Sequence, residues 1–264
     1  MPKVVALVGN PNVGKTTLFN ALTGQNLRTG NYPGVTVTRS AGSWAIPGTK
    51  VQLIDLPGSY SLAAHSPDEA LVTQFLQGQK GPRPDALLFI VDASNPERNF
   101  YFLSQLMDLG LPTVLALNMV DVAADKGLRV DPAALQKALG IPVIAIQASR
   151  GDGLAALAQA VAETLLAPQA AVGPGLPIDG PGATEPDCIR KRYAWSRQQL
   201  VNAIERSQKG AMKLSDRADR ILTHRVWGSL ALILIMGLVF QSIYTWSQPL
   251  MDGMDKLVSW LGGH

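Results

Sequence analysis

The sequence predicts a doubly wound α/β domain with a mostly parallel sheet, followed by a small all-helical domain and a C-terminal transmembrane-like helix. Three observations carry this prediction. Up to about Leu166, apolar strand-like runs alternate with helical patterns, the order that builds a parallel sheet covered on both faces. A proline- and glycine-rich stretch then leads into a charged helical region. Beyond it lies an uncharged apolar run of about 20 residues, the length of a membrane span.

Six strands are expected where apolar runs are bounded by turn residues. They cover Val4–Val8, Ser43–Ile46, Val51–Asp55, Ala86–Val91, Thr113–Asn118 and Val143–Gln147. A capping residue followed by proline predicts a helix start at Ser66-Pro67, Asn95-Pro96 and Asp131-Pro132. Gly24, Gly110 and Gly140 predict helix ends. Sheets of this kind bind ligands at the carboxyl ends of their strands.

The first predicted strand runs into Gly9–Thr16, which fits the phosphate-binding pattern Gly-x-x-x-x-Gly-Lys-Ser/Thr. A helix is predicted to follow, so backbone N–H groups and the helix N-terminus would face a polyphosphate. Lys15 would supply a cation for the β- and γ-phosphates, and the Thr16 hydroxyl would ligate Mg²⁺. The predicted contacts are Gly9, Asn10, Pro11, Asn12, Val13, Gly14, Lys15, Thr16 and Thr17. The alternative is an ordinary glycine-rich turn.

The stretch Asn26–Val37 interrupts the strand–helix alternation. It is polar and glycine-rich and has no clear periodicity, and a loop of this length in a compact domain is usually functional or disordered. It follows the phosphate-binding loop and its helix, where a nucleotide-sensing switch would lie. Gly34, Val35 and Thr36 lie in this stretch.

Asp55-Leu56-Pro57-Gly58 ends a predicted strand. An aspartate there can reach Mg²⁺ through water, and a glycine can offer its N–H to a γ-phosphate. Taken alone, Asp-x-x-Gly is a turn. Its place one strand after the phosphate-binding loop favours a role in nucleotide binding.

Asn118-Met119-Val120-Asp121 ends another predicted strand. The Asp121 carboxylate can accept hydrogen bonds from guanine N1–H and the 2-amino group, a donor pair that adenine lacks. The usual motif has lysine where Met119 stands, and a helix-capping aspartate is the alternative. Backbone N–H groups of Ala148, Ser149 and Arg150, after the last strand, could bind the guanine 6-oxo group.

These elements occur in the order of a translation-factor-class small GTPase. The wording of Gly9–Asn20, Gly30–Val37, Asp55–Leu62 and Asn118–Asp121 is similar to the ferrous iron transporter B (FeoB) family. The similarity is close over roughly the first 165 residues. It implies Mg²⁺-dependent GTP hydrolysis by the cytoplasmic part of an iron transporter.

The resemblance also implies roles for single residues. Gly34, Val35 and Thr36 would contact the nucleotide, and Thr36 would ligate Mg²⁺ when triphosphate is bound. Asn12 resembles the asparagine that coordinates K⁺ in potassium-activated members, where the ion replaces an arginine finger. Lys15, Thr36, Gly58 and Asn12 are thus the predicted catalytic residues. Ser59 occupies the place where many GTPases carry a water-orienting glutamine, so we expect slow hydrolysis.

Four regions are expected along the chain. They are a GTP-binding domain at 1–167, a linker and helical spacer at 168–225, a transmembrane helix at 226–246 and an amphipathic tail at 247–264. The spacer is either a solvated helical hairpin or, as the resemblance implies, an element that influences nucleotide release. A buried core helix is the alternative to the membrane span. One span cannot conduct an ion, which suggests a piece of a larger membrane protein.

Basic residues precede the apolar run at Lys213, Arg217, Arg220 and Arg225, which places 1–225 on the cytoplasmic side of an inner membrane. The net charge of +3 indicates no nucleic-acid partner. One cysteine, Cys188, fits a reducing compartment. Expected partners are GTP or GDP, the membrane, the remaining membrane domain and small accessory transport proteins; the oligomeric state stays open.

Two other functions compete with a GTPase of an iron transporter. One is a guanine-nucleotide-binding switch with little turnover, which the missing glutamine favours. The other is a soluble ribosome- or RNA-associated GTPase, against which the apolar tail argues. Met119 also leaves ATP open as a substrate, and no residue forms a plausible iron site.

Overall fold

The computed structural model describes residues 2–24, 29–30, 39–63, 66–167, 184–206, 222–224, 226–243, 253–254, 258 and 262. The chain forms two compact units, residues 1–210 and 211–264. Of the predicted regions, most of the switch loop, including Gly34, Val35 and Thr36, most of the proline-rich linker and most of the tail lie outside the described residues. Within the switch loop, Thr29–Gly30 forms a short strand.

The first unit is built on a seven-stranded sheet in the order β2-β3-β4-β1-β5-β6-β8. Its strands are β1 (Val4–Gly9), β2 (Thr29–Gly30), β3 (Arg39–Ile46), β4 (Thr49–Asp55), β5 (Ala86–Asp92), β6 (Thr113–Asn118) and β8 (Val143–Ala145). β4, β1, β5, β6 and β8 run parallel, whereas β2 and β3 form an antiparallel edge. The prediction of a mostly parallel sheet is confirmed.

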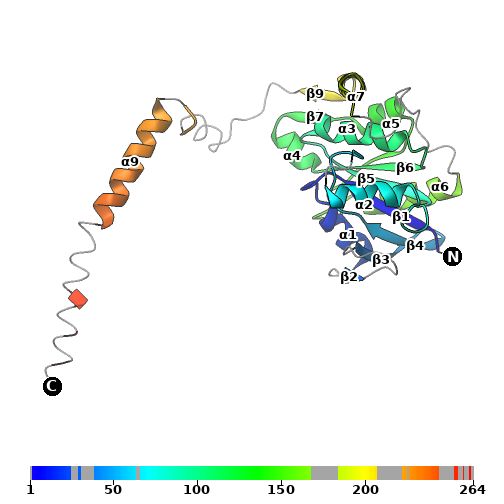
Figure 1. The fold of residues 1–264 in the computed structure, drawn as a ribbon, viewed down its shortest axis with the longest axis horizontal. Coiled ribbons are helices and arrows are strands. Elements are labelled where there is room, and N and C mark those ends of the chain that lie inside the picture. The colour runs from blue at the N-terminus through cyan, green and yellow to red at the C-terminus, as the bar shows by residue number, and fades with distance from the viewer. Residues whose placement is uncertain are drawn as a thin grey trace. The chain divides into compact units, whose positions relative to one another are not determined.

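Helices cover both faces of this sheet, as Figure 1 shows. α1 (Lys15–Thr23) and α6 (Leu154–Leu166) bury apolar residues against one face, and α2 (Pro67–Leu76), α3 (Pro96–Met107) and α5 (Pro132–Leu139) against the other. The short α4 (Val120–Asp125) follows β6. Two apolar cores result, separated by the sheet.

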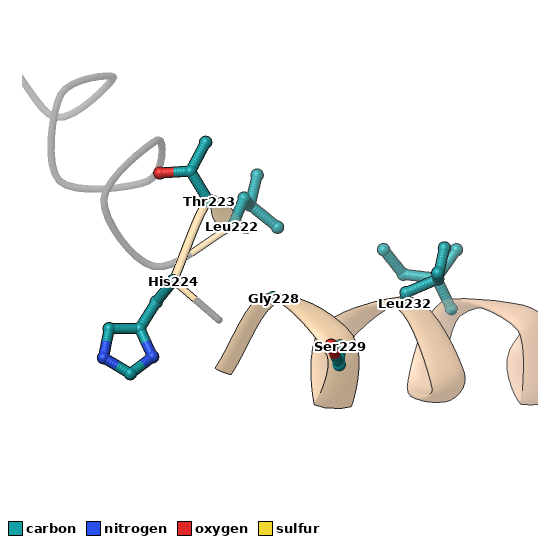
Figure 2. A pocket seen from close by; sticks show the side chains of 7 residues that line it. Leu222, Thr223, His224, Gly228, Ser229 and Leu232 are labelled. Atoms are coloured by element: carbon teal, nitrogen blue, oxygen red, sulfur yellow. The ribbon is translucent and has the colours of Figure 1, made fainter. Parts of the chain in front are cut away.

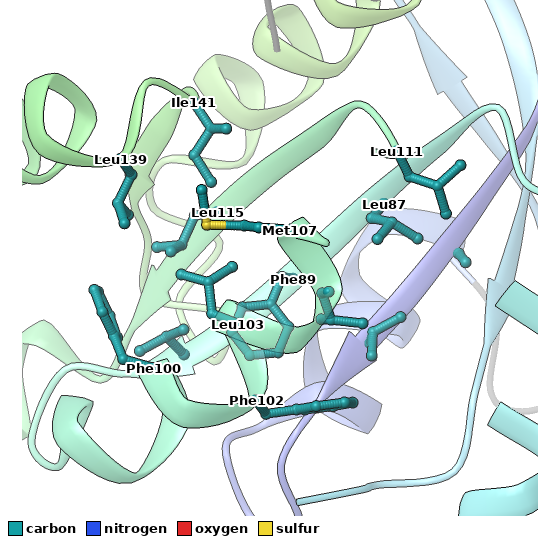
Figure 3. Packing of buried hydrophobic residues seen from close by; sticks show 14 of the residues in the cluster. Leu87, Phe89, Phe100, Phe102, Leu103, Met107, Leu111, Leu115, Leu139 and Ile141 are labelled. Carbon is teal, nitrogen blue, oxygen red and sulfur yellow. The ribbon is translucent and has the colours of Figure 1, made fainter. Parts of the chain in front are cut away.

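Strand β1 occupies the centre, and all six of its residues are buried. The larger core packs Phe89 of β5 edge-on against Phe102 of α3, with ring centroids 5.7 Å apart (Figure 3). Edge-to-face contact is favourable for aromatic rings because the positive edge of one meets the negative face of the other. α3 is thus fixed firmly over the strands that carry the site.

The predicted helix caps are partly confirmed. Ser66 accepts a hydrogen bond from the Glu69 N–H at 3.2 Å, and Asp131 accepts one from the Ala133 N–H at 2.9 Å. Gly140 ends α5 with φ 67°, where an L side chain would be strained. Asn95, however, makes no side-chain cap, and α3 ends at Met107 with Asp108 as its C-cap, before Gly110.

The prediction that the spacer after the linker is helical is wrong in part. α7 (Pro186–Val201) is a helix, but β9 (Ile204–Arg206) is a strand that pairs antiparallel with β7 (Leu128–Val130). The pattern around Ile204 fits helical spacing, but backbone pairing with β7 overrides this weak local preference. This two-stranded sheet joins the end of α7 to the nucleotide-binding unit.

α7 docks on α3 through a buried ion pair. The Arg192 guanidinium donates to the Asp108 carboxylate at 2.6 Å and to the Ser104 hydroxyl at 3.3 Å. Arg192 is 0% exposed. Such a pair fixes the helix position strongly, since either charge alone would be costly to bury.

In the second unit, α9 (Trp227–Gln241) has 15 residues, and none of its described side chains is buried. At 1.5 Å per residue it is about 22 Å long, short of the ~30 Å hydrocarbon core of a bilayer. No helix in the described part of the chain is long and apolar enough to span a membrane. The predicted span over 226–246 is not supported; residues 244–246 lie outside that part.

We expect Arg192→Ala to lower the free energy of unfolding by about 3 kcal/mol, because it removes the cation facing the buried Asp108 carboxylate. Urea denaturation of the full chain measures this loss. Arg190→Ala is the matched control on the same helix: its ion pair with Asp187 is 3.6 Å long and exposed, so little change is expected. Equal losses in the two variants would contradict the importance of the buried pair.

Candidate functional site

The predicted site residues that the structure describes lie together at the carboxyl ends of the parallel strands. β1, β4, β5 and β6 end there at Gly9, Asp55, Asp92 and Asn118. The strand register aligns Leu7 with Asp55 and Asp92 with Asn118. Segments far apart in the sequence therefore meet at the carboxyl ends of parallel strands, where ligands of such folds bind.

The phosphate-binding loop connects β1 to α1. Asn12 and Gly14 have positive φ values of 66° and 88°, so the chain turns sharply before the helix begins at Lys15. Gly14 lacks a capping side chain, which leaves the first turn of α1 without a side-chain cap. That turn can offer its N–H groups and the positive end of the helix dipole to an anion.

Lys15 forms an ion pair with Asp55, its Nζ lying 2.5 Å from the carboxylate Oδ1. Burial raises the pKa of the Asp55 carboxyl above its ordinary value, and the Lys15 charge and hydrogen bond offset part of that rise. The pair brings a cation for phosphate and a carboxylate for a metal ion to one point. A polyphosphate that binds Lys15 would free the Asp55 carboxylate from its ion pair with Lys15.

Asn118 joins two loops of the site. Its Nδ2 donates to the Val13 carbonyl at 2.9 Å, and its Oδ1 accepts from the Ala148 N–H at 3.1 Å. All of these groups are buried. The amide thus ties the phosphate-binding loop to the turn after β8, and its hydrogen-bonding capacity is directed to the protein.

The proposed base-binding residues flank this amide. Met119 has φ 59° and precedes α4, in whose first turn Asp121 lies exposed. The Met119 methyl carbon lies 3.7 Å from where a Cβ on Gly14 would stand, so this side chain covers the phosphate-binding loop. Ser149 and Arg150 are exposed beside the buried Ala148.

The Asp55–Gly58 segment crosses the phosphate-binding loop closely. A Cβ added at Gly58 would lie 3.1 Å from the Pro11 backbone, and the Ser59 N–H donates to the Gly9 carbonyl at 3.2 Å. Ser59 is 0% exposed, and its hydroxyl lies 3.5 Å from the Pro57 carbonyl. In this conformation Ser59 does not reach the solvent side of the site, where a water-orienting residue would act.

The remaining predicted contacts differ in how exposed their side chains are. The side chains of Asn12, Thr16 and Thr17 are exposed. Asn10 is 2% exposed, and neither polar atom of its amide has a hydrogen-bond partner among the described residues. Its side chain points into the protein, so only its backbone could contact a nucleotide directly.

A hollow of about 440 Å³ lies elsewhere, in the second unit (Figure 2). It is lined mainly by apolar and backbone groups around the start of α9, where His224 Nδ1 accepts from the Val226 and Trp227 N–H groups. The His224 side chain is therefore explained as a helix cap. This hollow contains none of the predicted site residues.

Comparison with known proteins decides the family. The family model described as Ferrous iron transport protein B matches residues 3–161. The chain belongs to the FeoB family. The Fe(2+) transporters FeoB of Salmonella typhimurium and Escherichia coli K12 are each 46% identical over 162 residues, which is 60% of this chain. The match spans only 20% of the length of these relatives.

Solved FeoB structures show the same fold. The cytosolic domain of L. pneumophila FeoB is 30% identical, with a TM-score of 0.64 over 77% of this chain and 100% of that one. The cytosolic domain of T. maritima FeoB in its GMPPNP form is 27% identical, with a TM-score of 0.64 over 77% and 99%. The N-terminal region of this FeoB chain is a GTPase domain of the P-loop class.

Sequence reasoning missed the structural role of Asn118 and the contribution of α3. The motif around Asn118 signals a base-binding loop, but its bond to the Val13 carbonyl links residues 105 positions apart. Gln105, whose amide oxygen accepts from the Leu62 N–H at 2.8 Å, gave no signal within its apolar helix. Such long-range partners follow only from the packed sheet.

We expect Asn118→Ala to weaken guanine-nucleotide binding at least tenfold, because the Val13 carbonyl and the Ala148 N–H both lose a buried partner. Titration with a fluorescent GDP analogue measures the affinity, and hydrogen exchange at Ala148 should become faster. Asn202→Ala, at an exposed asparagine after α7, serves as the control. Unchanged GDP affinity would contradict the importance of the Asn118 link.

Proposed function

We propose that this chain supplies the Mg²⁺-dependent GTPase part of a ferrous iron transporter, with residues 1–225 in the cytoplasm of an inner-membrane protein. The observation that supports nucleotide binding is that Lys15, Asp55 and Asn118 lie together at the carboxyl ends of the strands. The iron part rests on the family and on the names of its relatives. Iron is the cargo of the whole transporter.

The residues present fit a magnesium ion. The Thr16 hydroxyl is exposed at the start of α1, and the Asp55 carboxylate lies at the adjacent strand end. No group of three or more His, Cys, Asp and Glu side chains suited to a metal occurs in the described part. Mg²⁺ needs no such cage, because it is commonly held by one or two protein oxygens, phosphates and waters. Thr36 is the third proposed ligand.

The protein's own groups account for the chemistry proposed at the γ-phosphate. Backbone N–H groups of the phosphate-binding loop and Lys15 hold the β- and γ-phosphates, and the Gly58 N–H meets the γ-phosphate from the other side. Asn12 is exposed at the turn, and in this proposal it would coordinate K⁺, which would place positive charge near the negative charge that develops during hydrolysis. Since Ser59 is buried, slow turnover is expected.

Base selection is proposed to come from Asp121, with N–H groups of Ala148, Ser149 and Arg150. Asp121 is accessible in the first turn of α4, and Asn118 holds Ala148 next to the phosphate-binding loop. A carboxylate left without its guanine donors would disfavour adenine. Guanine-nucleotide binding with little turnover remains the second candidate, favoured by the buried Ser59.

The proposed domain plan has a GTP-binding domain at 1–167, a linker and spacer at 168–225 and a tail at 247–264. It replaces the predicted transmembrane helix at 226–246 by a membrane-proximal apolar segment. α6 ends at Leu166, which fits the first boundary. The apolar side chains of α9 are exposed, including Leu232, Ile233 and Leu234 at 61–69%. Exposed apolar surface of this extent fits a membrane or the remaining membrane domain. Accessory transport proteins and oligomers are further proposed partners.

Steady-state GTP hydrolysis in potassium and in sodium tests the proposed chemistry. We expect potassium to raise kcat, and Asn12→Ala to remove that stimulation, because the charge at the γ-phosphate would no longer be compensated. Asn202→Ala, at an exposed asparagine after α7 and outside the site, is the control. Equal slow rates in both salts would favour the binding switch, and efficient ATP turnover would contradict the role given to Asp121.

Vesicle flotation tests the membrane proposal. We expect the full chain to float with phospholipid vesicles and a chain lacking residues 226–264 to stay in solution, because the exposed apolar side chains of α9 are lost. Leu234→Lys with Leu238→Lys should reduce flotation while keeping the chain length. A full chain that does not bind vesicles would contradict the membrane proposal.

A further inference from the structure

The peptide groups of Leu62 are held by two helices. Its N–H donates to Gln105 Oε1 of α3 at 2.8 Å, and its carbonyl accepts from Thr73 Oγ1 of α2 at 3.0 Å. Leu62 is 3% exposed and Gln105 is 0% exposed. Most loop residues have their backbone groups in water, so this loop position is fixed to an unusual degree.

Leu62 lies three residues after Ser59, whose N–H donates to the Gly9 carbonyl. Each residue of an extended chain spans at most about 3.6 Å, so fixing Leu62 restricts where Gly58 and Ser59 can lie. Gly58 is the residue proposed to offer its N–H to the γ-phosphate. By holding Leu62, the Gln105 amide therefore restricts the position of Gly58, the proposed phosphate contact.

A stripe of α3 connects this amide to α7. Tyr101, Ser104, Gln105 and Asp108 are spaced three and four residues apart, so they lie on one face of the helix. Gln105 Nε2 lies 3.5 Å from the Tyr101 hydroxyl oxygen. The Tyr101 ring stacks on Tyr193 of α7, with centroids 4.9 Å apart and planes at 24°.

Two properties suit Tyr101 to orienting the Gln105 amide. Burial raises the pKa of the Tyr101 phenol above its ordinary value of 10.0, with the Arg192 charge opposing and Tyr193 and Cys188 adding to the rise, so the phenol is neutral at pH 7. Its oxygen then accepts from Nε2, which leaves Oε1 facing the Leu62 N–H. The neighbouring Arg192 contacts with Ser104 and Asp108 hold α7 in place for the ring stack.

We propose that Gln105 is a positioning residue for GTP hydrolysis, and that α7 acts on it through the stacked Tyr101 and Tyr193. Gln105 touches no nucleotide; it acts by holding the Leu62 peptide and thereby Gly58. This inference rests on the proposed GTPase function. It predicts an effect on triphosphate binding and turnover that GDP binding does not share, since only the triphosphate has a γ-phosphate.

The first test compares the Gln105→Met variant with the unaltered chain. Methionine keeps the side-chain length but removes both hydrogen bonds. We expect kcat and the affinity for GMPPNP to fall about tenfold, while the affinity for GDP changes less than about twofold; a tenfold change corresponds to about one buried hydrogen bond. Gln136→Met is the matched control. Gln136 lies on α5, and its Oε1 also accepts a hydrogen bond from a backbone N–H, that of Val143, at 3.3 Å. Gln136→Met should change neither kcat nor the affinities for GMPPNP and GDP.

The second test asks whether α7 acts through Gln105. Tyr193→Ala should lower kcat about threefold alone and have no further effect in the Gln105→Met background, whereas Tyr193→Phe should keep the ring stack and the activity. Additive effects of the two substitutions, or equal losses of GMPPNP and GDP affinity, would overturn the inference. If the unaltered chain binds GDP and GMPPNP but hydrolyses no GTP, the GTPase proposal fails, and the GMPPNP-to-GDP affinity ratio still decides the Gln105 role in binding. Absence of any nucleotide binding would overturn both.

Discussion

The parallel pairing of β1 with β4 on one side and β5 on the other is the constraint on which the site depends. β1 is buried along its whole length, so its neighbours and both helical layers fix its position and register. The phosphate-binding loop starts where β1 ends, and Asp55 stands at the matching end of β4. Any slip in register would separate Lys15 from Asp55 and the loop from Asn118.

The sequence predicted the mostly parallel sheet well, and it put the candidate site residues at strand ends, since both depend on local patterns. Apolar runs, several of them continuous, marked the strands of the parallel part, and the motifs lay at strand ends. Two parts of the fold could not be predicted in this way. β9 has only three residues, too short for a periodic signal, and it exists because β7 offers a free backbone edge. α9 looked like a span from composition, whereas its length of 15 residues falls short.

Within the site, the sequence pointed to residues by type but gave little about which way they face. Asn10 and Asn12 are two residues apart in the same motif, yet one amide is buried and the other is exposed. Their different directions follow from the sharp turn at Asn12. Ser59 likewise occupies the position of a water-orienting residue in many GTPases but faces inward. Backbone conformation in the loop, which composition does not reveal, decides these cases.

The docking of α7 on α3 also bears on how the protein comes to be made. Arg192 and Asp108 are separated by 84 positions in the chain. During synthesis, every strand of the large sheet and its five covering helices are translated before Arg192 is added. The nucleotide-binding unit can therefore assemble while Asp108 and the α3 stripe are still uncovered. Closing so long a loop carries an entropic cost that earlier folding of the sheet reduces, so α7 is expected to be the last part to settle. A newborn chain would pass through a stage in which the site has formed but the helix that adjusts it has not.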